Sequence, residues 1–196
     1  MAARVCKRDR LQPLVGALLW LLLGSVAWAQ PEPDSLAERW ARLLVRGDAF
    51  TSLEAENALV RLGPEARPVL ERLLQEGSRR REWQRAARVL GRLGDRRARP
   101  ALHRFLQRRK TDPLARLEAA RALLRLGDRY GIDVALELLA DSDRSIRLGA
   151  LLLFARYTHR DFGFRFDGPS GERAAALRRM RAWWESVRRD AVLVGP

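Results

Sequence analysis

Residues 119–127 read A-A-R-A-L-L-R-L-G, and this helical phrase occurs four times in the chain. Related copies are A-E-N-A-L-V-R-L-G at 55–63 and A-A-R-V-L-G-R-L-G at 86–94, and a degraded copy follows at 150–158. The first alanines of successive copies are 31, 33 and 31 residues apart. A repeat of this length predicts stacked helical modules, because one module cannot bury its own apolar face and needs neighbours.

Capping and stop signals divide the repeats into helices. Ser35 with Glu38 and Thr51 with Glu54 form S/T-x-x-E capping boxes, which predict helix starts. Glycines stand where helices should end, at 47, 63, 77, 94 and 127. We therefore expect an all-α fold of four antiparallel helix pairs: 35–46 with 51–62, 65–76 with 80–93, 97–109 with 113–126, and 130–140 with 143–157. No strand pattern competes with this prediction.

The repeat pattern stops after residue 158. Residues 161–167 alternate aromatic with small or charged side chains, and a Gly-Pro-Ser-Gly turn then precedes a last predicted helix at 172–189, which contains Trp183 and Trp184. The end of a repeat stack exposes an apolar face that a dissimilar segment can cover. We therefore divide the chain into a repeat solenoid at 30–158, an aromatic C-terminal cap at 159–190 and a tail at 191–196. An aromatic ligand site is the alternative for the cap.

The first 29 residues have the layout of a secretory signal peptide. Basic residues cluster within 1–10, an uncharged run covers 14–29, and Ala-Trp-Ala precedes the predicted cleavage after Ala29. We expect an exported protein, periplasmic in a Gram-negative cell and otherwise secreted, with no stable transmembrane anchor after cleavage. An uncleaved anchor is the alternative, although the run is shorter than the roughly 20 apolar residues of a membrane span. The only cysteine, Cys6, would be removed with this segment, which excludes the disulfide-framework class.

Positive charge is concentrated in one part of the chain. The formal net charge is +14, and residues 79–110 contain thirteen basic residues against Glu82 and Asp95. This distribution favours polyanionic partners, because clustered charge of one sign attracts them over a distance.

Arginines also recur at equivalent repeat positions. Arg61, Arg92, Arg125 and Arg156 share one position, so stacked modules should align them. The predicted partner-binding residues are Arg61, Arg85, Arg88, Arg92, Arg121, Arg125 and Arg156. An alternative is structural, because an arginine just before a helix-ending Leu-Gly can bond the last carbonyls of its own helix.

The repeats resemble HEAT repeats of the short bacterial type called lyase-like. The resemblance rests on A-A-R-A-L-L-R-L-G-D at 119–128 and on D-S-D-R-S-I-R at 141–147, and it covers about residues 50–158. Tyr157-Thr158 departs from it by replacing the terminal Leu-Gly. The ending at 161–184 is similar to those of exported bacterial HEAT proteins. The resemblance implies a right-handed α-solenoid with a C-terminal capping helix, and it implies very little chemistry.

Candidate catalytic and metal-ligating residues are few. His103 and His159 have no second histidine or cysteine nearby, which argues against a zinc site. H-R-D and D-F-G overlap at Asp161, whereas a kinase needs two separate aspartates. Asp141 and Asp143 lie at a predicted helix start, where capping explains them better than acid–base chemistry. We expect no catalytic residue, no metal and no cofactor.

The predicted function is therefore non-catalytic. We expect a monomeric scaffold or adaptor that binds an acidic partner protein on an Arg-lined concave face. The alternative is a binder of a non-protein polyanion, such as a lipid phosphate or an acidic glycan. Nucleic acid is the least favoured partner, because helical repeats that read bases need stacking side chains on the binding face. A weak hydrolase with a site that no motif reveals is a third possibility.

Overall fold

The computed structural model describes residues 34–108 and 111–191, and this part of the chain contains helices and no strands. The helices belong to the compact unit that begins at Ser35. The α-helices are α2 (Leu36–Arg46), α3 (Ala49–Leu62), α4 (Arg67–Glu76), α5 (Arg80–Leu93), α6 (Arg99–Leu106), α7 (Pro113–Arg125), α8 (Tyr130–Leu138), α9 (Arg144–Thr158) and α10 (Ser170–Val187). Short 3₁₀ helices, η1 (Gly63–Ala66) and η2 (Arg96–Ala98), precede α4 and α6. The predicted all-α class is confirmed for these residues.

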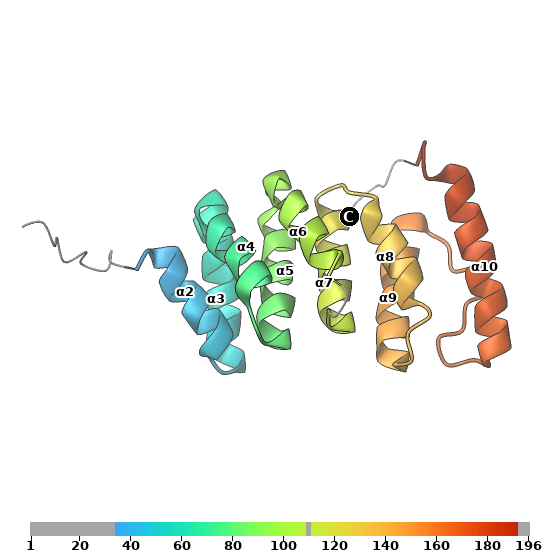
Figure 1. Ribbon diagram of the computed structural model, residues 1–196, viewed down its shortest axis with the longest axis horizontal. Helices are drawn as coiled ribbons and strands as arrows, with labels where there is room; N and C mark the ends of the chain where they lie inside the picture. Colours follow the sequence, from blue (N-terminus) through green and yellow to red (C-terminus); the bar gives the residue numbers. More distant parts are fainter. Residues whose placement is uncertain (1–33, 109–110, 192–196) are drawn as a thin grey trace, which may run out of the picture. The chain divides into compact units, whose positions relative to one another are not determined.

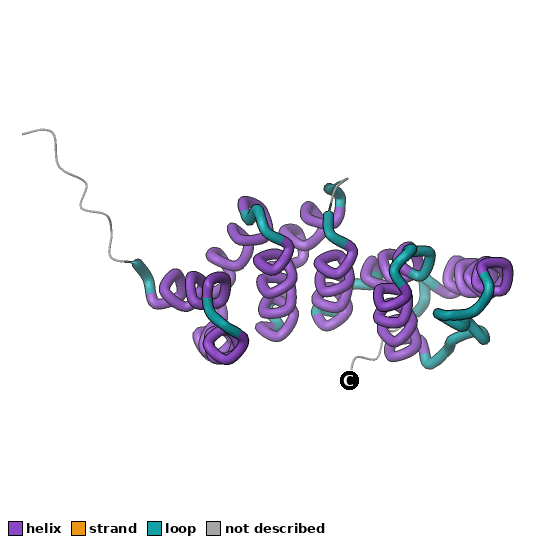
Figure 2. The backbone as a smooth tube through the Cα atoms, turned by 90° about the horizontal axis from the view of Figure 1, so that it is seen from below, coloured by secondary structure: helices purple, strands orange, loops and turns teal. Residues whose placement is uncertain are grey.

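The helices of this unit follow one another side by side in chain order (Figure 1). α2 packs on α3, α4 on α5, α6 on α7, and α8 on α9. α3, α5, α7 and α9 also contact one another in succession, and we call them the second-helix layer. α2, α4 and α6 contact one another in the same way (Figure 2). Equivalent repeat positions on neighbouring helices of the second-helix layer are therefore brought close together.

The capping prediction is confirmed at α2 and wrong at α3. Ser35 Oγ accepts the Glu38 N–H at 3.2 Å, and Glu38 Oε2 accepts the Ser35 N–H at 3.1 Å. Helix α3 begins earlier than expected, because Asp48 takes the N-cap position and accepts the Thr51 N–H at 2.8 Å. This hydrogen bond lowers the pKa of the Asp48 carboxyl.

The glycine signals also divide into two groups. Gly63, Gly94 and Gly127 have φ of 64°, 75° and 75°, the region that side chains resist, and each follows a helix as expected. Gly47 and Gly77 follow helices with φ of −67° and −55°, so neither needs a glycine for its backbone angle. Helix ends differ from the prediction by up to three residues, as at α6, which ends at Leu106 instead of 109.

One repeat position stabilises the turn within each helix pair through a side-chain hydrogen bond, although the side chain differs between repeats. The residue three positions before each repeat alanine donates a side-chain hydrogen bond to a carbonyl of the preceding turn. The donors are Ser52, Trp83, Arg116 and Arg147, and the acceptors are the carbonyls of Gly47, Gly77, Leu106 and Asp141, at 3.0, 2.8, 2.8 and 2.8 Å. These carbonyls need such donors because they lie at helix ends and turns, outside the regular helical ladder.

The core is built on small residues of the repeat. The repeat alanines Ala55, Ala86, Ala119 and Ala150 are fully buried. A Cβ on Gly91 of α5 would lie 2.8 Å from Ala122 Cα of α7, so these two helices approach closely because residue 91 lacks a side chain. Leucines fill the remaining space between the layers, and Leu59, Leu90 and Leu123 of the second-helix layer are completely buried.

The aromatic residues after α9 pack back onto the last repeat. Trp184 of α10 is buried, and its indole Nε1–H donates to Asp133 Oδ1 of α8 at 2.7 Å. The Trp183 ring meets the Phe154 ring of α9 edge to face, with centroids 6.0 Å apart. The predicted cap residues therefore contact both helices of the last pair.

The predicted signal peptide, residues 1–29, lies outside the described residues. Within residues 34–108 and 111–191, no helix combines the length and the apolar character that crossing a bilayer requires.

Candidate anion-binding face

The predicted partner-binding arginines all lie on the second-helix layer. Arg61 belongs to α3, Arg85, Arg88 and Arg92 to α5, Arg121 and Arg125 to α7, and Arg156 to α9. The structure separates them into three groups by the partners that their guanidinium groups find.

Arg85 is used within the fold. Its Nη1 donates a hydrogen bond to the Leu44 carbonyl in the last turn of α2, and its side chain is half-buried. A helix C-terminus carries unpaired carbonyls and a partial negative charge, so a guanidinium is a good partner for it. Arg85 therefore joins neighbouring repeats.

Arg88 and Arg92 form ion pairs with a buried glutamate of the preceding repeat. Glu56 of α3 is 6 % exposed, and its carboxylate oxygens lie 3.5 Å from Arg88 Nη1 and 3.3 Å from Arg92 Nη1. Arg92 Nη2 also donates to Asn57 Oδ1 at 2.7 Å. Glu56 thus neutralises part of the positive charge where α3 meets α5.

A second buried glutamate repeats this arrangement between α5 and α7. Glu118 is 4 % exposed, and its Oε1 lies 3.3 Å from Arg88 Nη2 and 3.0 Å from Arg121 Nη1. Its buried Oε2 makes no hydrogen bond to the described residues. Arg88 therefore bridges the two carboxylates, and the network Arg92–Glu56–Arg88–Glu118–Arg121 runs through three helices.

The sequence-based prediction of aligned partner-binding arginines did not include either glutamate. Glu118 precedes Arg121 by three residues, a spacing that places the two side chains together on a helix. Glu56 directly follows the repeat alanine at 55. These positions were visible in the sequence, but only stacking shows that each carboxylate reaches arginines of an adjacent helix.

The last junction of the second-helix layer lacks such a carboxylate. Ala120 of α7 stands at the repeat position that Glu56 has in α3, and Gly149 of α9 stands at the position that Glu118 has in α7. Arg125 and Arg156, which face this junction, are exposed and form no ion pair within the described residues. Positive charge is therefore left uncompensated where α7 meets α9.

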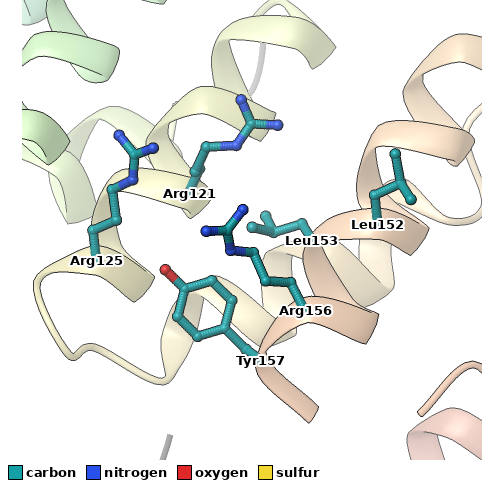
Figure 3. Close-up of a pocket in the computed structure, with 6 residues that line it drawn as sticks. All are labelled: Arg121, Arg125, Leu152, Leu153, Arg156 and Tyr157. Atoms are coloured by element: carbon teal, nitrogen blue, oxygen red, sulfur yellow. The ribbon is translucent and has the colours of Figure 1, made fainter. Parts of the chain in front are cut away.

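A pocket of about 290 Å³ lies at this junction, lined by Arg121, Arg125, Leu152, Leu153, Arg156 and Tyr157. Figure 3 shows Arg156 and Tyr157 pointing from one helix toward the helix that carries Arg121 and Arg125. Leu152, which lines the same pocket, is 61 % exposed. The pocket thus combines three guanidinium groups with an exposed apolar side chain.

Tyr157 contributes a hydroxyl on a largely buried side chain to this pocket. The residue is 4 % exposed, and its hydroxyl makes no hydrogen bond within the described part of the chain. Burial raises the pKa of Tyr157, while the positive charges of Arg125, Arg156 and Arg121 act in the opposite direction. The phenol therefore keeps its proton at neutral pH and can donate it to an acceptor in the pocket.

Tyr157 marks a departure from the repeat. Leu62, Leu93 and Leu126 stand at its equivalent positions. The degraded last copy therefore brings a polar atom to a position where the other copies have an apolar side chain.

Arg61 stands apart from both the network and the pocket. It lies in the last turn of α3, is exposed, and forms no ion pair or hydrogen bond to the described residues. No hydrogen bond in this part of the chain joins Arg61, Arg92, Arg125 or Arg156 to the last carbonyls of its own helix. Direct bonding to the last carbonyls is therefore not seen, but all four arginines lie in the last turn of their helices, where their charge complements the negative end of the helix dipole.

A wider hollow of about 920 Å³ lies between the C-terminal end of α2 and the N-terminal ends of α5 and α7. Its lining includes Arg46 from the end of α2, Arg79, Arg80 and Arg81 at the start of α5, and Leu114 of α7. These four arginines are exposed, and Arg80 has only a distant ion pair, 4.0 Å from Asp112. Three consecutive basic residues, Arg79, Arg80 and Arg81, thus face one hollow together with Arg46.

The other residues considered for catalysis or metal binding have partners within the fold. His103 Nε2 lies 2.8 Å from Asp128 Oδ2, and its ring stacks on Tyr130, so it is not simply solvated. Asp143 accepts the Ser145 N–H at 2.7 Å, which confirms the capping interpretation. Among the described residues, no group of three or more histidine, cysteine or acidic side chains is arranged to hold a metal ion.

The comparison with protein families agrees with this architecture over part of the chain. Residues 84–155 match the family of HEAT repeats, a region that runs from α5 into α9 and covers less than half of the 196 residues. No curated protein and no solved structure is significantly similar to the chain. The match and the helical repeat architecture together support a HEAT-repeat domain in this chain.

Proposed function

We propose that the chain is an exported, non-catalytic interaction scaffold that binds an acidic partner protein through its second-helix layer. HEAT repeats commonly mediate protein–protein interaction, and residues 84–155 match them. The proposal includes a right-handed solenoid of about four HEAT-like helix pairs with a C-terminal capping helix. It also includes the removal of residues 1–29 during export, which the layout of that segment favours.

One observation carries this proposal, the difference between paired and unpaired arginines. Arg88, Arg92 and Arg121 have carboxylate partners, and Arg85 holds a helix end, so a partner protein would have to compete for these side chains. Arg125 and Arg156 have no such partners among the residues that the structure describes, and they line a pocket. A hydrogen bond to a charged group contributes about 1.5–3 kcal/mol when no existing partner must be displaced. We therefore place the main contact between α7 and α9.

The wider hollow supports a second candidate function, the binding of a non-protein polyanion. Four exposed arginines around about 920 Å³ suit an extended chain of negative groups better than a single carboxylate. A lipid phosphate or acidic glycan would contact Arg46, Arg79, Arg80 and Arg81. This contact would weaken steeply with added salt, because binding a polyanion releases many counterions.

The proposal is tested by affinity capture from the exported fraction with the tagged full chain. The double substitution Arg125→Glu and Arg156→Glu should abolish capture of a specific acidic protein. The matched control is Arg39→Glu with Arg104→Glu, because both are exposed helical arginines whose side chains form no hydrogen bond or ion pair within the described residues, and they lie on α2 and α6. Equal capture by wild type and by the α7–α9 variant would contradict the proposed face.

The hollow is tested separately. Arg79→Glu with Arg81→Glu should remove binding to heparin, used as a model polyanion, and leave protein capture intact. If this variant loses the protein partner and the α7–α9 variant keeps it, the acidic protein binds at the wider hollow and the proposed assignment is wrong.

A further inference from the structure

We infer that the pocket between α7 and α9 is a receptor for a carboxylate group that has an apolar substituent beside it. The inference rests on the proposed function, because it names the chemical group of the acidic partner that enters this face. The carriers of such a group are a peptide C-terminus with an apolar last residue, or an aspartate or glutamate side chain next to an apolar one.

The fold itself provides the precedent for a carboxylate at this place. At the α3–α5 junction Glu56 contacts Arg88 and Arg92 of α5, and at the α5–α7 junction Glu118 contacts Arg88 of α5 and Arg121 of α7. The α7–α9 junction presents arginines at the same repeat positions, with Arg121 equivalent to Arg88 and Arg156 equivalent to Arg92. Ala120 of α7 and Gly149 of α9 replace the two glutamates there. A carboxylate from outside would complete the pattern that the other two junctions complete internally.

The donors in the pocket suit this group. Guanidinium groups bind carboxylates with two parallel hydrogen bonds, and Arg125 and Arg156 have no other partner within the described residues. The Tyr157 hydroxyl adds a neutral donor from a buried ring, so its direction is fixed by packing. Arg121 already shares Glu118, so it adds less to binding than the other two arginines.

The apolar requirement comes from Leu152. This leucine occupies the repeat position that Arg88 and Arg121 have in earlier modules, and it lines the pocket while 61 % exposed. Covering it would remove apolar surface from water, which favours a ligand with an apolar group next to its charge. At about 290 Å³ the pocket is near the lower end of ligand sites, which fits one side chain or one peptide terminus.

Calorimetric titration of the full chain with small acids tests the inference. Phenylacetate should bind at one site and at least about tenfold more tightly than acetate, because only phenylacetate covers Leu152. Arg156→Gln should weaken phenylacetate binding at least about tenfold, and Tyr157→Phe about two- to tenfold, since it removes one hydrogen bond. Arg104→Gln is the control and should change nothing.

Substitutions at Leu152 provide the sharpest comparison. Leu152→Glu would place a carboxylate in the pocket and imitate the internal glutamates, so phenylacetate binding should be lost. Glutamine has the same shape as glutamate but no charge, so Leu152→Gln should reduce the affinity for phenylacetate only to that for acetate. Both changes are at an exposed position, so the fold should tolerate them. Equal loss of binding in the two variants would overturn the assignment of a carboxylate site.

The remaining outcomes separate this inference from the proposed function. Peptides with a free or an amidated C-terminus, each with and without a glutamate, identify which carboxylate is bound. Phenyl phosphate binding more than tenfold tighter than phenylacetate would overturn the carboxylate inference in favour of a phosphate ester. Failure of every small acid and peptide to bind, with charge-dependent protein capture retained, would overturn the inference alone. Binding of phenylacetate without any protein capture would instead overturn the proposed protein partner.

Discussion

Nη2 of Arg88 on α5 lies 3.3 Å from Oε1 of Glu118 on α7, so a residue predicted to contact a partner is bound by a carboxylate of the next repeat. The same carboxylate oxygen lies 3.0 Å from Arg121. Glu118 is therefore both a link between repeats and the reason that positive charge does not run evenly along the second-helix layer. Its loss should affect stability more than that of an exposed acidic residue.

Replacing Glu118 with glutamine should lower the free energy of unfolding by about 1–2 kcal/mol, because the Glu118 carboxylate is buried and two guanidinium groups lose their charged partner. Glu137→Gln is the control. Glu137 forms a shorter ion pair, 2.6 Å from Arg116, but its side chain is 56 % exposed, so the loss should stay below about 0.5 kcal/mol. Urea unfolding measures both changes. Equal losses of unfolding free energy would mean that burial does not account for the stabilisation by the Glu118 ion pairs.

Gly91→Ala should destabilise the protein although alanine favours helices. The gain in helix propensity is about 1 kcal/mol, whereas a new Cβ would meet the Ala122 backbone at 2.8 Å and overpack the α5–α7 contact at a cost of about 1–3 kcal/mol. Gly171→Ala in α10 has open space around the new methyl group and should change stability by less than about 0.5 kcal/mol. Thermal unfolding of the two variants gives the comparison, and a more stable Gly91→Ala variant would refute the close approach of α5 and α7.

Arg147→Met should loosen the segment after α9. The buried guanidinium donates to the carbonyls of Asp141, Ser142 and Phe166 at 2.8, 2.7 and 2.8 Å. Methionine keeps the apolar stem and removes every donor, so we expect a loss of about 2–3 kcal/mol. Limited proteolysis should then cut near Phe166 faster than in wild type. Arg104→Met, at an exposed site, should leave the cleavage pattern unchanged.

The raised pKa of Tyr157 predicts a pH effect above neutrality. Burial favours the protonated phenol, so the native state holds this proton at a pH where the unfolded chain releases it. The contribution of Tyr157 to stability is therefore complete below its unfolded pKa of about 10 and is lost as the pH rises through the higher native value. Ultraviolet titration should show a phenolate component above pH about 10 that is absent in Tyr157→Phe, where only the signal of Tyr130 remains. A phenolate signal from Tyr157 below that pH would contradict the burial argument.

Helix signals in the sequence were local, and most of them were correct. The Ser35 capping box and the left-handed glycines at 63, 94 and 127 depend only on neighbouring backbone groups, so a linear reading can find them. The Thr51 box failed because Asp48, also a good N-cap, lies three residues earlier and competes for the same N–H. Such competition changes a helix boundary without changing the fold.

The repeat spacing of about 31–33 residues was enough to predict stacked helices and the alignment of equivalent positions, because a periodic apolar face must be buried against its own copies. Which arginines carry uncompensated charge was decided only in three dimensions. Glu56 reaches Arg92 across 36 residues, and Glu118 reaches Arg88 across 30. An ion pair depends on distances of a few ångströms between side chains of different helices, and no order of residues along the chain specifies those distances until the helices have packed.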